Sequence, residues 1–230
     1  MRSLYLENLE DYDDEIILKS KEFHHLVNVI RIKVGENVNF FDENENVYLV
    51  ELINLTKKEL TFKILEKEKA KTSGVRFSVA VGKLKKEALD LSIKQLVEIG
   101  VGTLYIYESE YSQTYNLKDD RVKKIIISSM EQSNNYIFPK VQETKLDEIL
   151  TLEKSLVYFS STLKNHQKID TTDEDLLIII GPEGGLSEKE ENLILSKTPN
   201  VFNLPTNILR ASTAVSLCSG FVLGRESVKI

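Results

Sequence analysis

The pattern of hydrophobic and polar positions divides the chain into two regions of different character. Residues 2–65 carry short β-branched and aromatic runs separated by Asn, Asp, Gly and Lys turns, which predicts strands at 2–6, 15–19, 37–41, 47–55 and 60–65. Apolar residues at helical spacing predict one helix over residues 20–31, with Ser20 as its N-cap. Several short strands with a single helix favour a small β-barrel.

The second region alternates strands with helices. Residues 66–74 have little apolar content and end in Ser-Gly, so we expect a linker there. Beyond it the sequence predicts strands at 77–81, 104–107, 155–159, 176–180 and 201–203, and helices at 83–99, 119–132, 187–197 and 212–226. This alternation predicts a mostly parallel sheet with helices on both faces. We therefore expect an α/β protein with domains at 1–70 and 71–230.

One stretch of the second region has the features of a ligand crevice. The run Leu176-Leu177-Ile178-Ile179-Ile180 does not alternate, which predicts a strand buried on both faces. It ends in the turn Gly181-Pro182-Glu183-Gly184-Gly185, where glycine lets a ligand approach backbone N–H groups. Ser187 and Glu190 form a capping box that starts the next helix. Open α/β sheets bind ligands in such crevices, and a second irregular loop at 204–214 follows.

Composition limits the possible settings. The 230 residues are 41% hydrophobic, which is enough for true cores, and no apolar run has the length of a membrane span or of a signal-peptide core. A single cysteine, Cys218, excludes an internal disulfide and favours a reducing cytoplasm. The net charge of −6 argues against a protein that simply coats nucleic acid. Residues 71–94 are locally basic, which more often means a solvated helix face than an RNA contact.

Several common chemistries lack their motifs. The glycine turn is followed by no Gly-Lys-Ser/Thr and has no Gly-x-Gly-x-x-Gly spacing, which excludes the common nucleotide-binding loops. There is no Gly-x-Ser-x-Gly elbow of an α/β hydrolase. His24 and His25 are adjacent and cannot share one helix face, and His166 stands alone, so we expect no metal site.

Arg210 is the most informative single residue. It is one of six arginines in a chain that otherwise uses lysine, and it precedes a Ser-Thr helix start. A cation disfavours a helix N-terminus, so a negative or polar ligand group should offset it; the alternative is a pair with a surface carboxylate. Cys218 shares an apolar helix face and predicts a buried, inert thiol. His24 and His25, with Arg31 and Lys33, form either a polar face toward RNA or part of a helix that plugs the barrel.

Two C-terminal motifs, in order, carry a family resemblance: Ile180-Gly181-Pro182-Glu183-Gly184-Gly185-Leu186-Ser187 and Ile208-Leu209-Arg210-Ala211-Ser212-Thr213-Ala214. Supporting matches are His24-His25-Leu26-x-x-Val29-Ile30-Arg31-x-Lys33-x-Gly35, Glu98-Ile99-Gly100-Val101, and Glu131-Gln132-Ser133 with Pro139. The chain thereby resembles the bacterial ribosomal RNA small subunit methyltransferase E family, within the SPOUT (trefoil-knot) methyltransferases.

The resemblance implies a fold and a reaction. It implies an N-terminal PUA-like β-barrel that helps to hold RNA and a C-terminal SPOUT α/β domain whose last segment forms a trefoil knot. Members bind S-adenosylmethionine in the knot, form homodimers, and methylate N3 of a uridine in 16S ribosomal RNA. The implied catalytic residues are Arg210 and Glu183, although Glu183 is equally suited to stabilising its turn. The implied cofactor-binding residues are Ile180, Gly181, Gly184, Gly185, Leu204, Ile208, Leu209, Thr213 and Ala214.

The chain departs from the family pattern where RNA contacts are expected. Ser212 stands where Glu is usual, and Tyr111 and Asn135 stand where Arg is usual. Lost arginines weaken phosphate contacts, for which lysines provide substitute point charges. The predicted RNA-binding residues are therefore His24, His25, Arg31, Lys33, Lys83, Lys85 and Lys86. Two alternatives remain open: a SPOUT methyltransferase acting on another RNA, such as transfer RNA, and a catalytically quiet ribosome-binding protein.

Overall fold

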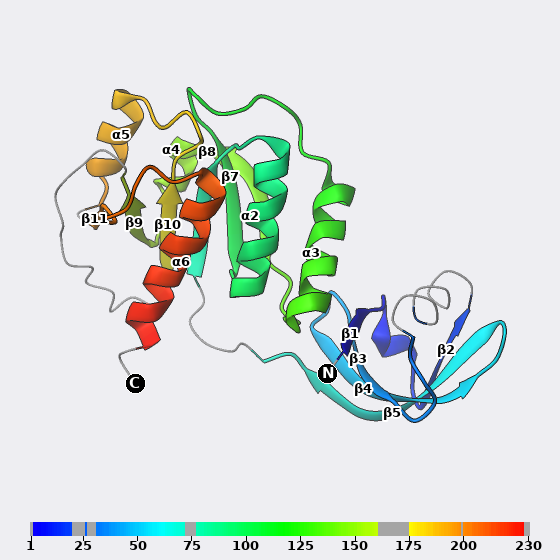
Figure 1. Cartoon of the computed structure of the whole chain (residues 1–230). Coiled ribbons are helices and arrows are strands. Elements are labelled where there is room, and N and C mark those ends of the chain that lie inside the picture. The colour runs from blue at the N-terminus through cyan, green and yellow to red at the C-terminus, as the bar shows by residue number, and fades with distance from the viewer. Residues whose placement is uncertain are drawn as a thin grey trace. The chain divides into compact units, whose positions relative to one another are not determined.

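A computed structural model describes residues 2–19, 26, 31–71, 77–160, 175–198 and 200–227. The chain forms two compact units, each built on its own sheet (Figure 1). The first unit is Met1–Lys71 with Met130–Phe138, and the second is Thr72–Ser129 with Pro139–Ile230. No helix in the described ranges combines the length and the apolar character that crossing a membrane requires.

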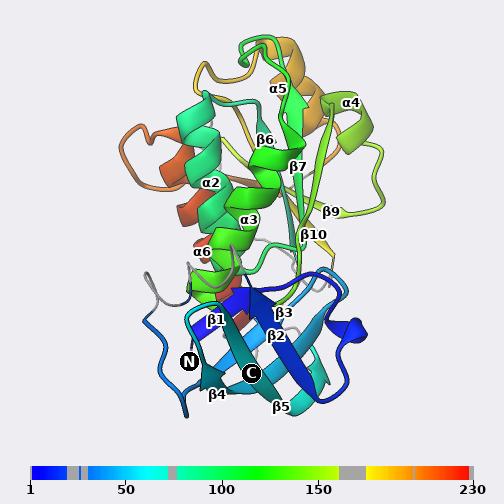
Figure 2. The same cartoon turned by 90° about the vertical axis from the view of Figure 1, so that its right-hand side faces the viewer.

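The sheet of the first unit has five strands in the order β1-β3-β4-β5-β2. The strands are β1 (Arg2–Tyr5), β2 (Glu15–Lys19), β3 (Asn37–Phe41), β4 (Asn46–Leu55) and β5 (Glu59–Lys69), and a short 3₁₀ helix η1 (Leu9–Asp11) joins β1 to β2. Only the β1–β3 pairing is parallel. The strands form a curved sheet, as Figure 2 shows. They share one apolar core, in which the rings of Phe40 and Phe62 meet edge to face with centroids 5.0 Å apart. The five predicted strands are therefore confirmed.

A segment from the middle of the chain completes the first unit. In Met130–Phe138, Asn134 accepts a hydrogen bond of 2.6 Å from the Ser3 hydroxyl, and the Tyr136 hydroxyl accepts one of 2.8 Å from the Asn39 amide. The rings of Tyr136 and Phe138 pack on Phe41, with centroids 5.5 and 6.2 Å away. This addition was not predicted, because the hydrophobic pattern of residues 119–132 indicates one uninterrupted amphipathic helix.

The linker predicted at 66–74 is wrong for its first part. Strand β5 continues to Lys69, and its partner β4 runs alongside it with Asn46 opposite Lys69 and Tyr48 opposite Lys67. The side chains of 66–69 are exposed, which hid the strand from a hydrophobic pattern, while backbone pairing with β4 satisfies the polar groups of the main chain. Residues 72–76 lie outside the described part.

The sheet of the second unit has six strands in the order β11-β9-β10-β6-β7-β8, and every pairing is parallel. The strands are β6 (Phe77–Gly82), β7 (Thr103–Glu108), β8 (Lys140–Lys145), β9 (Ser155–Phe159), β10 (Leu176–Ile180) and β11 (Val201–Phe202). The predicted parallel sheet is confirmed. Edge strand β8 was missed because its sequence, Lys-Val-Gln-Glu-Thr-Lys, has almost no buried residue; such polar strands are suited to a sheet edge.

Helices cover both faces of this sheet. They are α2 (Lys86–Ile99), α3 (Asp119–Ser133), α4 (Leu146–Ile149), α5 (Glu188–Leu195) and α6 (Ala211–Ser227). Helices α2 and α6 pack against each other, and α6 also contacts β10 (Figure 1). On the other face, α4 and α5 join Leu177 and Ile179 of β10 in one core. All five residues of β10 are buried, as the unbroken apolar run predicts. The implied knot stays a prediction, since residues 161–174, between β9 and β10, lie outside the described part.

Candidate functional site

A pocket of about 460 Å³ lies at the carboxyl ends of strands β9 and β10 in the second unit. Three segments form most of its wall: the end of β9 at Tyr158–Ser160, the turn at 180–186, and the loop at 203–209 with the start of α6. Glu191 of α5 completes the wall. Parallel strands bring their carboxyl ends to one edge, and the loops that follow them form the crevice. The two loops singled out from the sequence therefore share a single pocket.

The glycines of the turn are required by its geometry. Gly185 has a φ of 77°, a left-handed conformation, and its N–H donates to the carbonyl of Pro182 at 2.9 Å. A Cβ on Gly184 would lie 2.8 Å from the Cβ of Tyr111 and 3.0 Å from its carbonyl oxygen. The predicted capping box is confirmed, with Ser187 and Glu190 each accepting from the other's backbone N–H. The turn is thus held from both sides in a shape that leaves backbone open to the pocket.

Glu183 is occupied with a structural contact. Its carboxylate accepts a hydrogen bond from the backbone N–H of Lys85, at 3.0 Å to one oxygen and 3.4 Å to the other. Lys85 is the N-cap residue of α2, whose own side chain makes no cap. A carboxylate at a helix N-terminus satisfies an orphan N–H and complements the helix dipole. Of the two roles left open for Glu183, the geometry favours the structural one, because the contact ties its turn to the start of α2.

The second loop presents apolar side chains to the pocket and its arginine to the outside. Leu204, Ile208 and Leu209 line the wall, and Ile208 is 94% exposed. Arg210 is exposed and does not line the pocket, although both of its neighbours in sequence, Leu209 and Ala211, do. Arg210 therefore follows the pocket wall directly in sequence, and its side chain is open to solvent.

The predicted cofactor residues fall together, with one exception. The pocket is lined by Ile180, Gly181, Gly184, Gly185, Leu204, Ile208, Leu209 and Ala214. Thr213 is exposed and is not part of the lining. Helix α6 begins at Ala211, so Ser212 and Thr213 belong to its first turn, and Thr213 lies on its outer face.

Four polar lining residues, Tyr158, Ser160, Glu191 and Asn203, were missed in the sequence. The hydroxyls of Tyr158 and Ser160 donate to one carboxylate oxygen of Glu191, at 2.8 and 3.0 Å, and the Asn203 amide donates to the Ser160 carbonyl at 3.1 Å. Burial, with the Glu191 carboxylate second, raises the pKa of Tyr158 well above its ordinary value, so its hydroxyl stays a donor. The residues lie on different elements, and only the register of β9 with β10 and β11 brings them together. Glu191 thereby adds a second carboxylate, besides that of Glu183, to a wall of mixed polar and apolar residues.

Cys218 is buried, as predicted, and also lines the pocket. Burial raises the pKa of its thiol to about 12, so the thiol is neutral and inert at physiological pH.

The predicted RNA-binding residues divide into three groups. His24 and His25 lie outside the described residues. Arg31, Lys33, Lys85 and Lys86 are exposed, which fits a role on the surface.

Lys83 differs from the other lysines and contradicts the prediction of a direct RNA contact. It is 3% exposed, pairs with Glu143 and Glu108, and donates to the Tyr115 carbonyl at 2.8 Å. A buried ammonium needs such partners. Strand β7 lies beside β6 and β8 lies beside β7, and carboxylates from both strands reach the residue that follows β6.

The positions that depart from the family pattern also have local partners. Tyr111 is half exposed, with its Cβ and carbonyl against Gly184. Asn135 accepts from the N–H of Ile137 at 3.0 Å, within the segment that joins the first unit. Ser212 is buried in the first turn of α6.

Comparison with known proteins identifies the family. A family model described as an RNA methyltransferase domain matches residues 71–222, and one described as an RNA methyltransferase PUA domain matches residues 18–65. The chain is 30% identical over 212 residues to ribosomal RNA small subunit methyltransferase E 2 of Borreliella burgdorferi, covering 87% of each chain. The chain belongs to the ribosomal RNA small subunit methyltransferase E family. The corresponding enzyme of Mesomycoplasma hyopneumoniae is 29% identical over 216 residues, with 89% of this chain and 92% of that one covered.

Solved structures agree with the fold of this family. The ribosomal RNA small subunit methyltransferase E of Neisseria gonorrhoeae, bound to S-adenosyl methionine, matches with a TM-score of 0.84 at 24% identity over 98% of each chain. A predicted RNA methyltransferase of Thermotoga maritima matches with a TM-score of 0.71 at 27% identity over 99% of each chain. The first unit is accordingly PUA-like and the second is of the SPOUT type. Within the described residues, no cluster of three or more His, Cys, Asp or Glu could hold a metal ion.

Proposed function

We propose that this protein transfers the methyl group of S-adenosylmethionine to N3 of a uridine in 16S ribosomal RNA, as a cytoplasmic homodimer that uses no metal. The single observation that carries the proposal is the pocket at the ends of β9 and β10. It unites both C-terminal motifs of a family whose named members are small-subunit ribosomal RNA methyltransferases.

The pocket suits the methyl donor in size and chemistry. Its volume of about 460 Å³ lies in the ordinary range for ligand sites. Leu204, Leu209 and Ala214 offer apolar contacts to an adenine ring, and the backbone of Gly181 and Gly184 offers polar groups without a Cβ in the way. S-Adenosylmethionine also carries a sulfonium and an ammonium group, and Glu191 provides a carboxylate of opposite charge on the wall.

Arg210 is the proposed catalytic residue. When bound, the sulfonium supplies an activated methyl group, so the protein's task is to position the uracil and stabilise its charge. Uridine N3 gives up its proton to solvent before it attacks, and negative charge then spreads to the neighbouring carbonyl oxygens. The exposed guanidinium of Arg210, which stands between two lining residues in sequence, is suited to stabilise that charge and to orient the ring. Glu183 has no proposed part in moving the proton, because its carboxylate caps α2.

The PUA-like unit is proposed to hold RNA outside the pocket. The proposed RNA-binding domain comprises residues 1–70, and the proposed methyltransferase domain comprises residues 71–230. The proposed RNA contacts of the first domain are Arg31 and Lys33, which are exposed, together with His24 and His25. Each lost phosphate contact would lower the salt dependence of RNA binding.

The test has three measurements on the full-length protein. Calorimetry determines S-adenosylmethionine binding, and mass spectrometry maps methylated uridines in ribosomal RNA from cells with and without the gene. Turnover is then compared between wild type and Arg210→Lys. We expect binding, loss of one uridine methyl mark, and a turnover that falls far more than cofactor affinity in the variant.

Each alternative predicts a different result. A protein that binds ribosomes but not S-adenosylmethionine is the catalytically quiet alternative. A methyl mark lost from transfer RNA, with ribosomal RNA unchanged, identifies another substrate. Unchanged turnover in Arg210→Lys sinks the proposed role of the guanidinium.

A further inference from the structure

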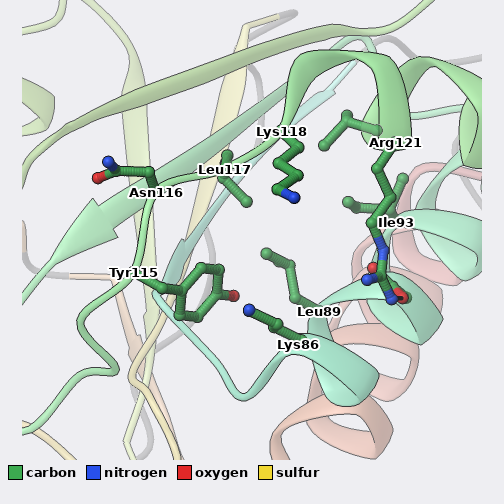
Figure 3. A pocket seen from close by; sticks show the side chains of 10 residues that line it. Lys86, Leu89, Ile93, Tyr115, Asn116, Leu117, Lys118 and Arg121 are labelled. Atoms are coloured by element: carbon green, nitrogen blue, oxygen red, sulfur yellow. Dashed lines mark hydrogen bonds and ion pairs between the residues drawn. The ribbon is translucent and has the colours of Figure 1, made fainter.

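A second, smaller pocket of about 100 Å³ lies between α2 and the start of α3, within the second unit (Figure 3). It shares no lining residue with the pocket at the ends of β9 and β10. The volume is that of a few water molecules, enough for one planar ring or one phosphate group. Helix α2 contributes Lys86, Leu89, Asp90 and Ile93, and the opposite wall is Tyr115–Lys118 with Arg121 and Val122.

The pocket has an apolar floor and a fixed aromatic wall. Leu89, Ile93 and Val122 are buried beneath it. The Tyr115 hydroxyl donates to the Leu84 carbonyl at 2.7 Å, and the Tyr115 carbonyl accepts from Lys83 at 2.8 Å. Both ends of this residue are therefore anchored, so its ring is positioned before any ligand arrives.

The rim of the pocket is positively charged. Arg121 pairs with Asp90, which neutralises both. Lys86 lies 5.3 Å from the centre of the Tyr115 ring, and Lys118 extends from the start of α3 toward the middle of the opening in Figure 3. Within the described residues neither lysine forms an ion pair. Two ammonium groups above an apolar floor fit a ligand that joins an anion to a ring.

The start of α2 connects the two pockets. Glu183, which lines the larger pocket, accepts from the N–H of Lys85, and the next residue, Lys86, lines the smaller one. The Lys83 carbonyl also accepts from the N–H of Gln113, which ties the segment before Tyr115 to the same place. The linings of the two pockets therefore meet at the start of α2. A linear polymer bound across this helix start would contact both pockets.

We propose that this second pocket is an RNA subsite, which holds one nucleotide that neighbours the methylated uridine. The phosphate lies against Lys86 and Lys118, and the base or ribose lies on the apolar floor beside Tyr115. Single-stranded RNA is commonly bound in this way, by cations that follow the backbone and aromatic rings that contact bases. The subsite rests on the proposed function, since it needs RNA as the substrate. A free nucleotide has the same chemistry, and the test separates the two.

Two variants probe the site by different means. Lys118→Gln removes a charge from the rim, and Leu117→Trp fills the opening without changing charge. Lys197→Gln is the matched control, because Lys197 is exposed in the same unit and lines neither pocket. Unfolding temperature and S-adenosylmethionine affinity verify that each variant folds and keeps the larger pocket.

The measurements are the KM for small-subunit RNA, RNA affinity across a salt series, and cross-linking by RNA that carries 4-thiouridine. We expect both variants to raise KM with S-adenosylmethionine affinity unchanged. Lys118→Gln should lower the slope of log affinity against log salt by about 0.7, the value for one phosphate contact in single strands. Cross-links should map by mass spectrometry to the peptide containing Tyr115 and Leu117 in wild type and disappear in Leu117→Trp.

The outcomes are distinct. A wild type that neither binds nor methylates RNA contradicts the proposed function itself. A wild type that is active, with both variants and the control indistinguishable from it, contradicts the subsite alone. Uridine 5′-monophosphate that shifts Tyr115 and Leu117 resonances while RNA parameters stay unchanged would assign the pocket to a free nucleotide and overturn the RNA subsite.

Discussion

Replacing Glu183 separates its structural role from a catalytic one. Its carboxylate caps α2 through the N–H of Lys85, a helix start whose own residue provides no side-chain cap. Glu183→Ala removes the acceptor, which should cost about 1 kcal/mol, the usual cost of losing an N-cap. Glu183→Gln keeps an amide oxygen in place and loses only the charge at the helix N-terminus, about 0.3–1 kcal/mol.

The assay compares unfolding temperature and turnover at saturating substrate. In a chain of this size about 1 kcal/mol corresponds to roughly 2–4 °C, so we expect that decrease in the Ala variant and a smaller one in the Gln variant. Glu188→Gln is the matched control, since Glu188 is an exposed acid in the first turn of α5. Turnover of Glu183→Gln should stay close to wild type. A folded Gln variant whose turnover falls by about 10²-fold or more would refute this reasoning, because losses of that size mark a general acid or base.

Three further predictions concern buried contacts. Gly184→Ala should weaken S-adenosylmethionine binding, because the new Cβ meets Tyr111 at 2.8 Å, whereas Gly102→Ala, with its nearest atom at 3.5 Å, should bind as wild type does by calorimetry. Lys83→Met should lower the free energy of unfolding by about 1.5–3 kcal/mol, the value for a hydrogen bond to a charged group, and so lower the unfolding temperature. Weaker RNA binding at unchanged stability would contradict this and indicate that Lys83 contacts RNA directly. Cys218 should resist alkylation at pH 8 until the protein unfolds, because burial raises the pKa of its thiol from 9.0 to about 12. The unfolded chain ionises this thiol first, so its contribution to stability is present below about pH 9 and is lost as pH rises toward 12, which a pH series of unfolding temperatures would detect.

The parts of the molecule that were predicted are those where the local sequence determines structure. An unbroken aliphatic run can be buried on both faces only between helices, which gives β10. Ser187 and Glu190 stand three residues apart, and a capping box needs nothing more. The glycine turn at 181–185 lies between β10 and this capping box, so its position is also predicted, together with one wall of the larger pocket.

The parts that were missed depend on distant partners. Strand β8 and the end of β5 are polar and become strands through pairing with β7 and β4. Glu191 looks like an ordinary acid in the first turn of a helix, and only the position of β9 brings Tyr158 and Ser160 to it. Lys83 belongs to a basic stretch in sequence, but its partners come from two other strands. Hydrophobic periodicity contains no information on such contacts.

Strand β7 and the segment after it hold the glycine turn of the larger pocket in place. The Tyr107 hydroxyl donates to the Ile180 carbonyl at 3.0 Å, and the Cβ and carbonyl of Tyr111 lie against Gly184. Further along, the Tyr115 carbonyl is held by Lys83. At Tyr111 the atoms that shape the glycine turn are backbone and Cβ, which almost every residue possesses, while the ring is half exposed. The side chain at position 111 can therefore change without moving the turn.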